Sequence, residues 1–226
     1  SSGQIQALTT DQVRALNTDD INALASDQFN KLTTSQIQAL TTEQLNHLGT
    51  DSLNALGTAQ FATLTPVQFG ALTTDQLSRL ETADLRAVTT NTLRGLSSDQ
   101  IQALTSDEVG SLTTAQITTL TFSQVQGLTT ADMVALTSAQ VAVLTSNQIP
   151  ALSTDQLAAI EAVDIKSITT TALRALSSAQ IDALTSDQLR ALTSAQLNAL
   201  TTAPLDAVTT GEVQGVPTAD TVSRLS

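Results

Sequence analysis

The side chains that could do chemistry in this chain are few, and they recur at intervals of eight residues or multiples of eight. His47 is the only histidine, and therefore the only candidate for an imidazole base or metal ligand. Carboxylates such as Asp11, Asp27 and Asp75 share one column of this spacing and could suggest calcium. Calcium, however, needs roughly six to eight oxygens gathered in one loop, and no DxDxDG loop is present. A second column includes the basic residues Arg86, Arg94, Lys166, Arg174 and Arg190.

None of these residues has the partners that catalysis requires. His47 shares its column with the larger residues Lys31, Thr63 and Arg79, which favours an ordinary surface position. The sequence contains no HExxH, GxGxxG or P-loop motif. It also contains no cysteine, which excludes a thiolate nucleophile and a Cys-based zinc site. We therefore expect no enzyme activity, no catalytic residue, no cofactor and no metal site.

The spacing comes from an eight-residue repeat, here called the octad, which runs from residue 1 to residue 216 in 27 copies. Clear copies are TTDQLSRL (residues 73–80) and TSDQLRAL (residues 185–192). Positions 5 and 8 are apolar in all 27 copies, position 1 is Ser or Thr in 21, and position 4 is Gln in 17. A period this short predicts one elongated repeat array rather than separate globular domains.

The octad has the pattern of a capped helix. Ser or Thr at position 1 followed three residues later by Gln is a capping box, in which each side chain bonds the other residue's backbone N–H. Pro66 suits the first helical position, whereas Pro150 at position 6 predicts a local distortion. Asp at position 3 stabilises the helix N-terminus. One continuous helix is excluded because about 800° of rotation per octad would carry the apolar stripe around the helix. The octads also lack the alternation of a β-solenoid.

Alternate octads differ, which points to a longer unit. Ile at position 5 occurs only in odd-numbered octads, as in Ile5, Ile21 and Ile37. We therefore predict an all-α, short-repeat α-solenoid with two short capped helices per 16-residue coil, like stacked on like. At the usual 8 to 10 Å between helices, 13 such coils would make a rod or superhelix of roughly 100–130 Å. Residues 1–216 form the single solenoid, and residues 217–226 are a C-terminal cap or frayed tail.

A longer echo is also present. Residues 81–96 (ETADLRAVTTNTLRGL) recur ten octads further along as residues 161–176 (EAVDIKSITTTALRAL). The basic residues Arg86 and Arg94 correspond to Lys166 and Arg174 in the second copy. The echo is explained either by a superhelical period or by a duplication.

Composition limits the partners. A net charge of -12 with nine basic residues disfavours nucleic acid and anionic membranes. No apolar stretch approaches the about 20 residues of a membrane span. Position 6 varies most between octads and includes the basic residues Arg86, Arg94, Lys166, Arg174 and Arg190, so a protein or glycan partner would be recognised there. Ser1 begins in octad register, as in a slice of a longer array whose ends could associate end to end.

The consensus Leu-Thr-Thr-Asp-Gln-Leu/Ile-x-Ala-Leu, as in residues 72–80, resembles octapeptide-repeat tracts of large bacterial secreted or cell-surface proteins. The resemblance implies an extracellular or cell-surface location. It also implies a structural scaffold, stalk or spacer without catalytic activity. The main alternative is a solenoid that binds a protein or glycan through position 6. A further alternative is ice binding through the regular threonines.

Overall fold

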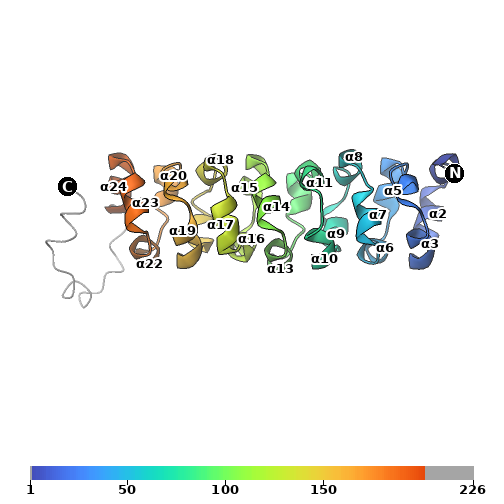
Figure 1. Cartoon of the computed structure of the whole chain (residues 1–226), viewed down its shortest axis with the longest axis horizontal. Helices are drawn as coiled ribbons and strands as arrows, with labels where there is room; N and C mark the ends of the chain where they lie inside the picture. The colour runs from blue at the N-terminus through green and yellow to red at the C-terminus, as the bar shows by residue number, and fades with distance from the viewer. Residues whose placement is uncertain (1, 202–226) are drawn as a thin grey trace.

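The computed structural model describes residues 2–201 of the chain, and these residues form a rod of short helices without a strand (Figure 1). Each of the first 25 octads contributes one helix, and octad 26 contributes only Thr201, the last residue of α24. The octads expected beyond this point and the tail 217–226 lie outside the described residues. The helices are α1 (Ser2–Gln6), α2 (Thr10–Ala15), α3 (Thr18–Asn22), α4 (Ser26–Phe29), α5 (Thr34–Ala39), α6 (Thr42–Asn46), α7 (Thr50–Asn54), α8 (Thr58–Phe61), α9 (Pro66–Phe69), α10 (Thr74–Leu77), α11 (Thr82–Ala87), α12 (Thr90–Leu93), α13 (Ser98–Gln102), α14 (Ser106–Ser111), α15 (Thr114–Thr119), α16 (Phe122–Gly127), α17 (Thr130–Ala135), α18 (Ser138–Ala142), the 3-10 helix η1 (Ile149–Ala151), α19 (Thr154–Ala159), α20 (Ala162–Ile165), α21 (Thr170–Leu173), α22 (Ser178–Asp182), α23 (Ser186–Ala191) and α24 (Ser194–Thr201).

A capping box sets where most of the helices begin. In octad 15 the backbone of Thr113 is extended, with φ -70° and ψ 155°, and α15 starts at the next residue. The Thr113 hydroxyl accepts the backbone N–H of Gln116 at 3.2 Å, and Gln116 Oε1 accepts the backbone N–H of Thr113 at 2.8 Å. The helix ends before Leu120, which leaves the helical conformation with φ -56° and ψ 131° and leads into the next octad. The predicted short capped helix is therefore confirmed.

The prolines follow the same logic. Pro66 occupies the first turn of α9 behind the N-cap Thr65, as expected. Pro150 replaces the α-helix of octad 19 with the 3-10 helix η1, so the predicted distortion is also confirmed. The ring of a proline so late in the octad is incompatible with a regular α-helical turn. Pro204 lies outside the described residues.

The coil of the solenoid is longer than the two-octad coil predicted from the sequence. Most helices pack on the helix three octads further along, as α2 does on α5, α11 on α14, and α20 on α23. Three octads is an odd number, so helices of opposite sets meet: Val13 belongs to α2 and Ile37 to α5. The prediction of two helices per coil, with like stacked on like, is wrong.

Hydrogen bonds between neighbouring coils join residues 25 to 31 apart in sequence. One turn of the solenoid therefore contains more than three and fewer than four octads. Three short helices with extended connections can enclose a core from several sides, whereas two can only sandwich it. The alternation of Ile with other apolar residues does not indicate the number of octads per coil, because Ile37 and Leu45 occupy the same octad position and are both fully buried. Side chains of similar volume replace one another in a core at little cost.

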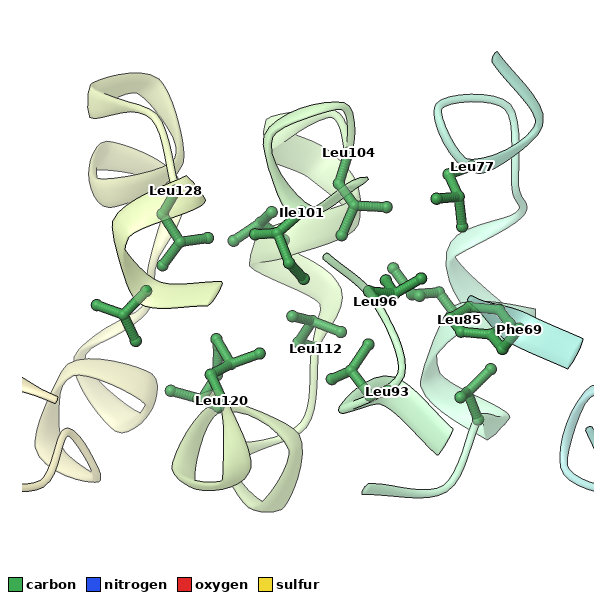
Figure 2. Packing of buried hydrophobic residues seen from close by; sticks show 14 of the residues in the cluster. Phe69, Leu77, Leu85, Leu93, Leu96, Ile101, Leu104, Leu112, Leu120 and Leu128 are labelled. Atoms are coloured by element: carbon green, nitrogen blue, oxygen red, sulfur yellow. The ribbon is translucent and has the colours of Figure 1, made fainter. Parts of the chain in front are cut away.

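One apolar core runs along the axis of the rod. The apolar residues at positions 5 and 8 point inward from every side, as Leu85, Leu93, Ile101 and Leu112 do in Figure 2. Position 5 of most octads is completely buried, and position 8 is nearly so. Each octad therefore adds two aliphatic or aromatic groups to a core that its neighbours complete, which explains why the octads must be stacked to be stable.

The glutamine at position 4 has a second role that the sequence analysis missed. Gln124 Nε2 donates to the carbonyl oxygens of Leu93 at 2.9 Å and Leu96 at 2.8 Å, which belong to the coil below. From octad 5 to octad 25, every glutamine at position 4 donates to carbonyls of the octad four earlier, and Thr92 bonds Leu64 in the same way. These glutamines are Gln36, Gln44, Gln60, Gln68, Gln76, Gln100, Gln116, Gln124, Gln140, Gln148, Gln156, Gln180, Gln188 and Gln196.

The amide suits this place because it is both an acceptor and a double donor. Its oxygen caps its own helix, while its nitrogen donates to two carbonyls at the end of a helix in the neighbouring coil. Across the described residues, backbone–backbone hydrogen bonds outside the helices join residues three or four apart. The polar links between coils therefore run through side chains.

The coil length also sets the length of the rod. Twenty-five octads at more than three and fewer than four per circuit make about six to eight coils, which at 8–10 Å per coil span about 50–80 Å. This value replaces the 100–130 Å expected from two-helix coils. Figure 1 shows the rod running from α1 at one end to α24 at the other.

Candidate partner surface

The five basic residues singled out at position 6 all lie at the surface, as does Arg14, a sixth basic residue in this column. Arg86 and Arg190 occupy the last turns of α11 and α23. The other three, Arg94, Lys166 and Arg174, are the C-cap residues of α12, α20 and α21. A cation at a helix C-terminus interacts favourably with the helix dipole, so these positions stabilise the helices as well as exposing charge.

The structure brings only some of these residues together. The helices α20 and α23 pack on each other, so Lys166 and Arg190 belong to adjacent coils. Arg190 also pairs with Asp187 at 3.2 Å, which partly neutralises it. Arg86 and Arg94 belong to α11 and α12 near the middle of the rod, far from the helices α20 and α23 of Lys166 and Arg190 (Figure 1). The five residues form two separate groups and not one continuous groove.

The longer sequence echo agrees with the coil length. Three circuits, each of more than three and fewer than four octads, can span the ten octads that separate the two copies. Figure 1 accordingly shows α11 and α20, which carry Arg86 and Lys166, along the same edge of the rod. A superhelical period and a duplication both remain compatible with this arrangement.

Other residues at position 6 form hydrogen bonds at the surface between adjacent coils. Asn22 Nδ2 donates to the carbonyl oxygen of His47 at 2.8 Å, and Asn22 Oδ1 accepts the backbone N–H of Gly49 at 3.1 Å. Asn46 and Asn54 make the same kind of bond to the next coil. Position 6 therefore serves two purposes, and its asparagines are not a free recognition surface.

One hollow in the described surface holds amide groups that are already paired. It is lined by Thr42, Asn46, Gly70 and Gln100. In it Asn46 donates to Ala71, and Gln100 donates to Gly70 and Leu72. These groups link coils, and they do not converge on an open point where a ligand could sit.

His47 caps its own helix. Its ring nitrogen Nδ1 lies 2.9 Å from the carbonyl oxygen of Glu43, one turn earlier, and the ring is exposed. Within residues 2–201 no three histidine, cysteine or acidic side chains come close enough to bind a metal ion together. No helix in this part of the chain has the length and apolar character that crossing a membrane requires.

Of the hydroxyls considered for ice binding, many of those at position 1 are engaged in the caps. Threonines at position 1, such as Thr33, Thr73 and Thr113, accept a backbone N–H from the first turn of their helix. Their oxygens are therefore oriented by the helix, and not by a lattice on the surface.

Four carboxyl groups replace the glutamine at position 4 in the middle of the rod, and all four are buried: Asp84, Glu108, Asp132 and Asp164. Asp132 accepts the hydroxyl of Ser106 at 2.8 Å and the backbone N–H of Thr129 at 2.7 Å. Asp164 accepts the hydroxyl of Ser138. Burial, with a contribution from the charge of Glu81, raises the pKa of Asp84 to about 6. The sequence analysis had not recognised that these carboxyl groups lie inside the rod.

A continuous core, capped helices of one octad each and side-chain links between coils define an α-solenoid repeat protein. Comparison with known families agrees with this class. The profile of the ALTTAQ repeat matches residues 1–34, 15–50, 30–66, 45–81, 77–114, 128–161 and 157–194, and the chain belongs to this repeat family. Each matched stretch covers a little more than four octads, and therefore slightly more than one coil. No curated protein matches the chain.

Proposed function

We propose that this repeat protein acts as a rigid spacer or stalk, without catalytic activity, in the extracellular or cell-surface setting that its resemblance to octapeptide tracts implies. The observation that carries the proposal is the single axial core crossed by a repeated glutamine link. Every octad has nearly the same interior, so adding octads lengthens the rod without changing its construction. Length and stiffness are therefore the properties that this architecture can supply.

Paired spin labels test the proposal, because the chain has no native cysteine. Exposed Arg14, Asp99 and Asp182 are changed to cysteine in pairs and labelled. A rigid spacer predicts narrow distance distributions, with the 14–182 distance about twice the 14–99 distance, since stacked repeats extend linearly. Broad distributions, or equal distances for the two pairs, would contradict a stiff rod.

A binding role is the second candidate, because Lys166 and Arg190 lie on packed helices of adjacent coils. The partner would be an acidic protein segment or an anionic glycan attracted by these side chains. Binding to an array of sulfated and neutral glycans is compared between the native chain and a Lys166→Gln/Arg190→Gln variant. Retention that is equal for the two proteins, or absent for both, would reject this candidate.

A further inference from the structure

Glu108 stands where the rod elsewhere uses glutamine, and one of its oxygens has no partner. The residue is 3% exposed at position 4 of octad 14, in the first turn of α14. Oxygen Oε2 accepts the backbone N–H of Thr105 at 2.6 Å and the Thr105 hydroxyl at 2.9 Å, as a capping glutamine oxygen would. Oxygen Oε1 is buried without a hydrogen-bond partner.

The register shows what Oε1 faces. Glutamines at position 4 donate to carbonyls 28 and 31 residues earlier, as Gln116 does to Val88 and Leu85, both at 2.9 Å. For Glu108 these separations lead to Leu80 and Leu77. An ionised carboxylate has only acceptor oxygens, so it cannot donate to either carbonyl. A protonated carboxyl group has one O–H, which restores one of the two bonds.

The charges around Glu108 also favour the proton. The ionisable groups on the surrounding helices and loops are Asp107 on α14, Glu81, Asp84 and Arg86 at α11, Asp132 on α17, and Asp75 and Arg79 in octad 10. Arg79 is paired with Asp75 at 3.1 Å, and Arg86 is exposed. No ion pair found among the described residues includes Glu108, so no cation compensates its charge.

We propose that Glu108 is a pH-sensitive latch between two coils: its protonated carboxyl group ties α14 to the carbonyls of octad 10, and loss of the proton loosens this junction. Burial raises the pKa of Glu108, an effect that the two hydrogen bonds from Thr105 and the proximity of the Leu80 backbone oppose in part. Because the folded pKa lies above the ordinary value of 4.5, the junction is strongest below pH 4.5 and weakens as the pH rises through the folded pKa.

Hydrogen exchange over residues 77–80 and 105–112 tests the latch in the full chain, between pH 4 and pH 8 and corrected for intrinsic rates. Asp84→Asn is included in every protein because Asp84 also titrates in this range. With Glu108 present, the opening constant is expected to rise about ten-fold for each unit by which the folded pKa exceeds the ordinary value. With Glu108→Gln, the opening constant stays low and constant, since the amide donates at every pH.

Two further variants complete the test. Gln116→Glu places the same carboxyl group at a junction that now has an amide, and is expected to make α15 pH-sensitive. Glu43→Gln removes an exposed carboxylate at position 3 of octad 6, in α6, and is expected to leave the profile of α14 unchanged. Parallel profiles for Glu108 and Glu108→Gln, or a constant opening constant with Glu108 present, would overturn the proposal. So would a Gln116→Glu protein whose α15 does not respond to pH.

Discussion

Replacing Gln116 with alanine is expected to weaken two levels of the structure at once. The side chain accepts the backbone N–H of Thr113 at 2.8 Å and donates to the carbonyls of Leu85 and Val88, both at 2.9 Å. Gln116 is 1% exposed, so water does not readily replace the lost amide. The change therefore breaks a helix cap and a link between coils.

The magnitude follows from these three bonds. Each intramolecular hydrogen bond contributes a net of about 0.5–1.5 kcal/mol, which gives a loss of about 2–4 kcal/mol in the free energy of unfolding for Gln116→Ala. Gln102 provides the matched control, because it is an exposed glutamine at position 6. Gln102→Ala is expected to change the free energy of unfolding by less than about 0.5 kcal/mol.

The assay is urea unfolding followed by far-ultraviolet circular dichroism, since the chain has no Trp or Tyr for fluorescence. The midpoint is compared at constant m-value, so that a change in stability is separated from a change in the unfolded state. If Gln116→Ala lowered the midpoint no more than Gln102→Ala, the inferred role of the position-4 amide would be refuted.

Three other predictions test packing, register and charge. Gly127→Ala is expected to lower the free energy of unfolding by about 1–3 kcal/mol, because its Cβ would overlap the carbonyl oxygen of Ser98. Gly49→Ala serves as the control, since its Cβ would meet open space. Equal urea midpoints for the two variants would contradict the close approach of the backbones. Two deletions test the register: octad 15 alone (residues 113–120), and octads 15 and 16 together. Because each octad packs on the one three octads away, neither deletion preserves that register, and we expect similar melting temperatures. A clearly lower melting temperature for the single deletion would instead support two-helix coils. The pKa of Asp84 in the folded protein is about 6, so its carboxyl group makes the protein less stable as the pH rises from 3.8 through 6. Asp84→Asn is therefore expected to raise the free energy of unfolding at pH 8 by about 1–2 kcal/mol, after allowance for solvent screening. Urea midpoints at pH 4 and pH 8 check this, and an equal gain at both values would contradict it.

Local features of this chain could be predicted because they depend on neighbours in sequence. The capping box of Thr113 and Gln116 closes over three residues, so the octad pattern alone predicted a short helix. The same holds for Pro66 in a first turn and for the distortion at Pro150. The exposed position of Arg86 followed from the variability of its column.

Partners distant in sequence could not be predicted in this way. Gln124 has the same neighbours in the octad whether or not its amide reaches Leu93 and Leu96 in another coil. The one available signal was the preference for Gln at position 4, where Glu would cap a helix equally well. That preference identifies a donor, but it does not identify which carbonyls receive the bonds.

The sequence by itself determined the unit of this protein: an octad with a capped helix, an inward pair of apolar residues and few groups capable of catalysis. Only the tertiary structure decided how many octads complete a coil. The angle between successive short helices depends on packing and on hydrogen bonds over 25 to 31 residues, and a two-octad alternation of Ile with Leu, Val or Phe carries no information about it. For the same reason, only the structure placed Glu108 against a neighbouring coil, where the lack of an N–H donor becomes a physical constraint.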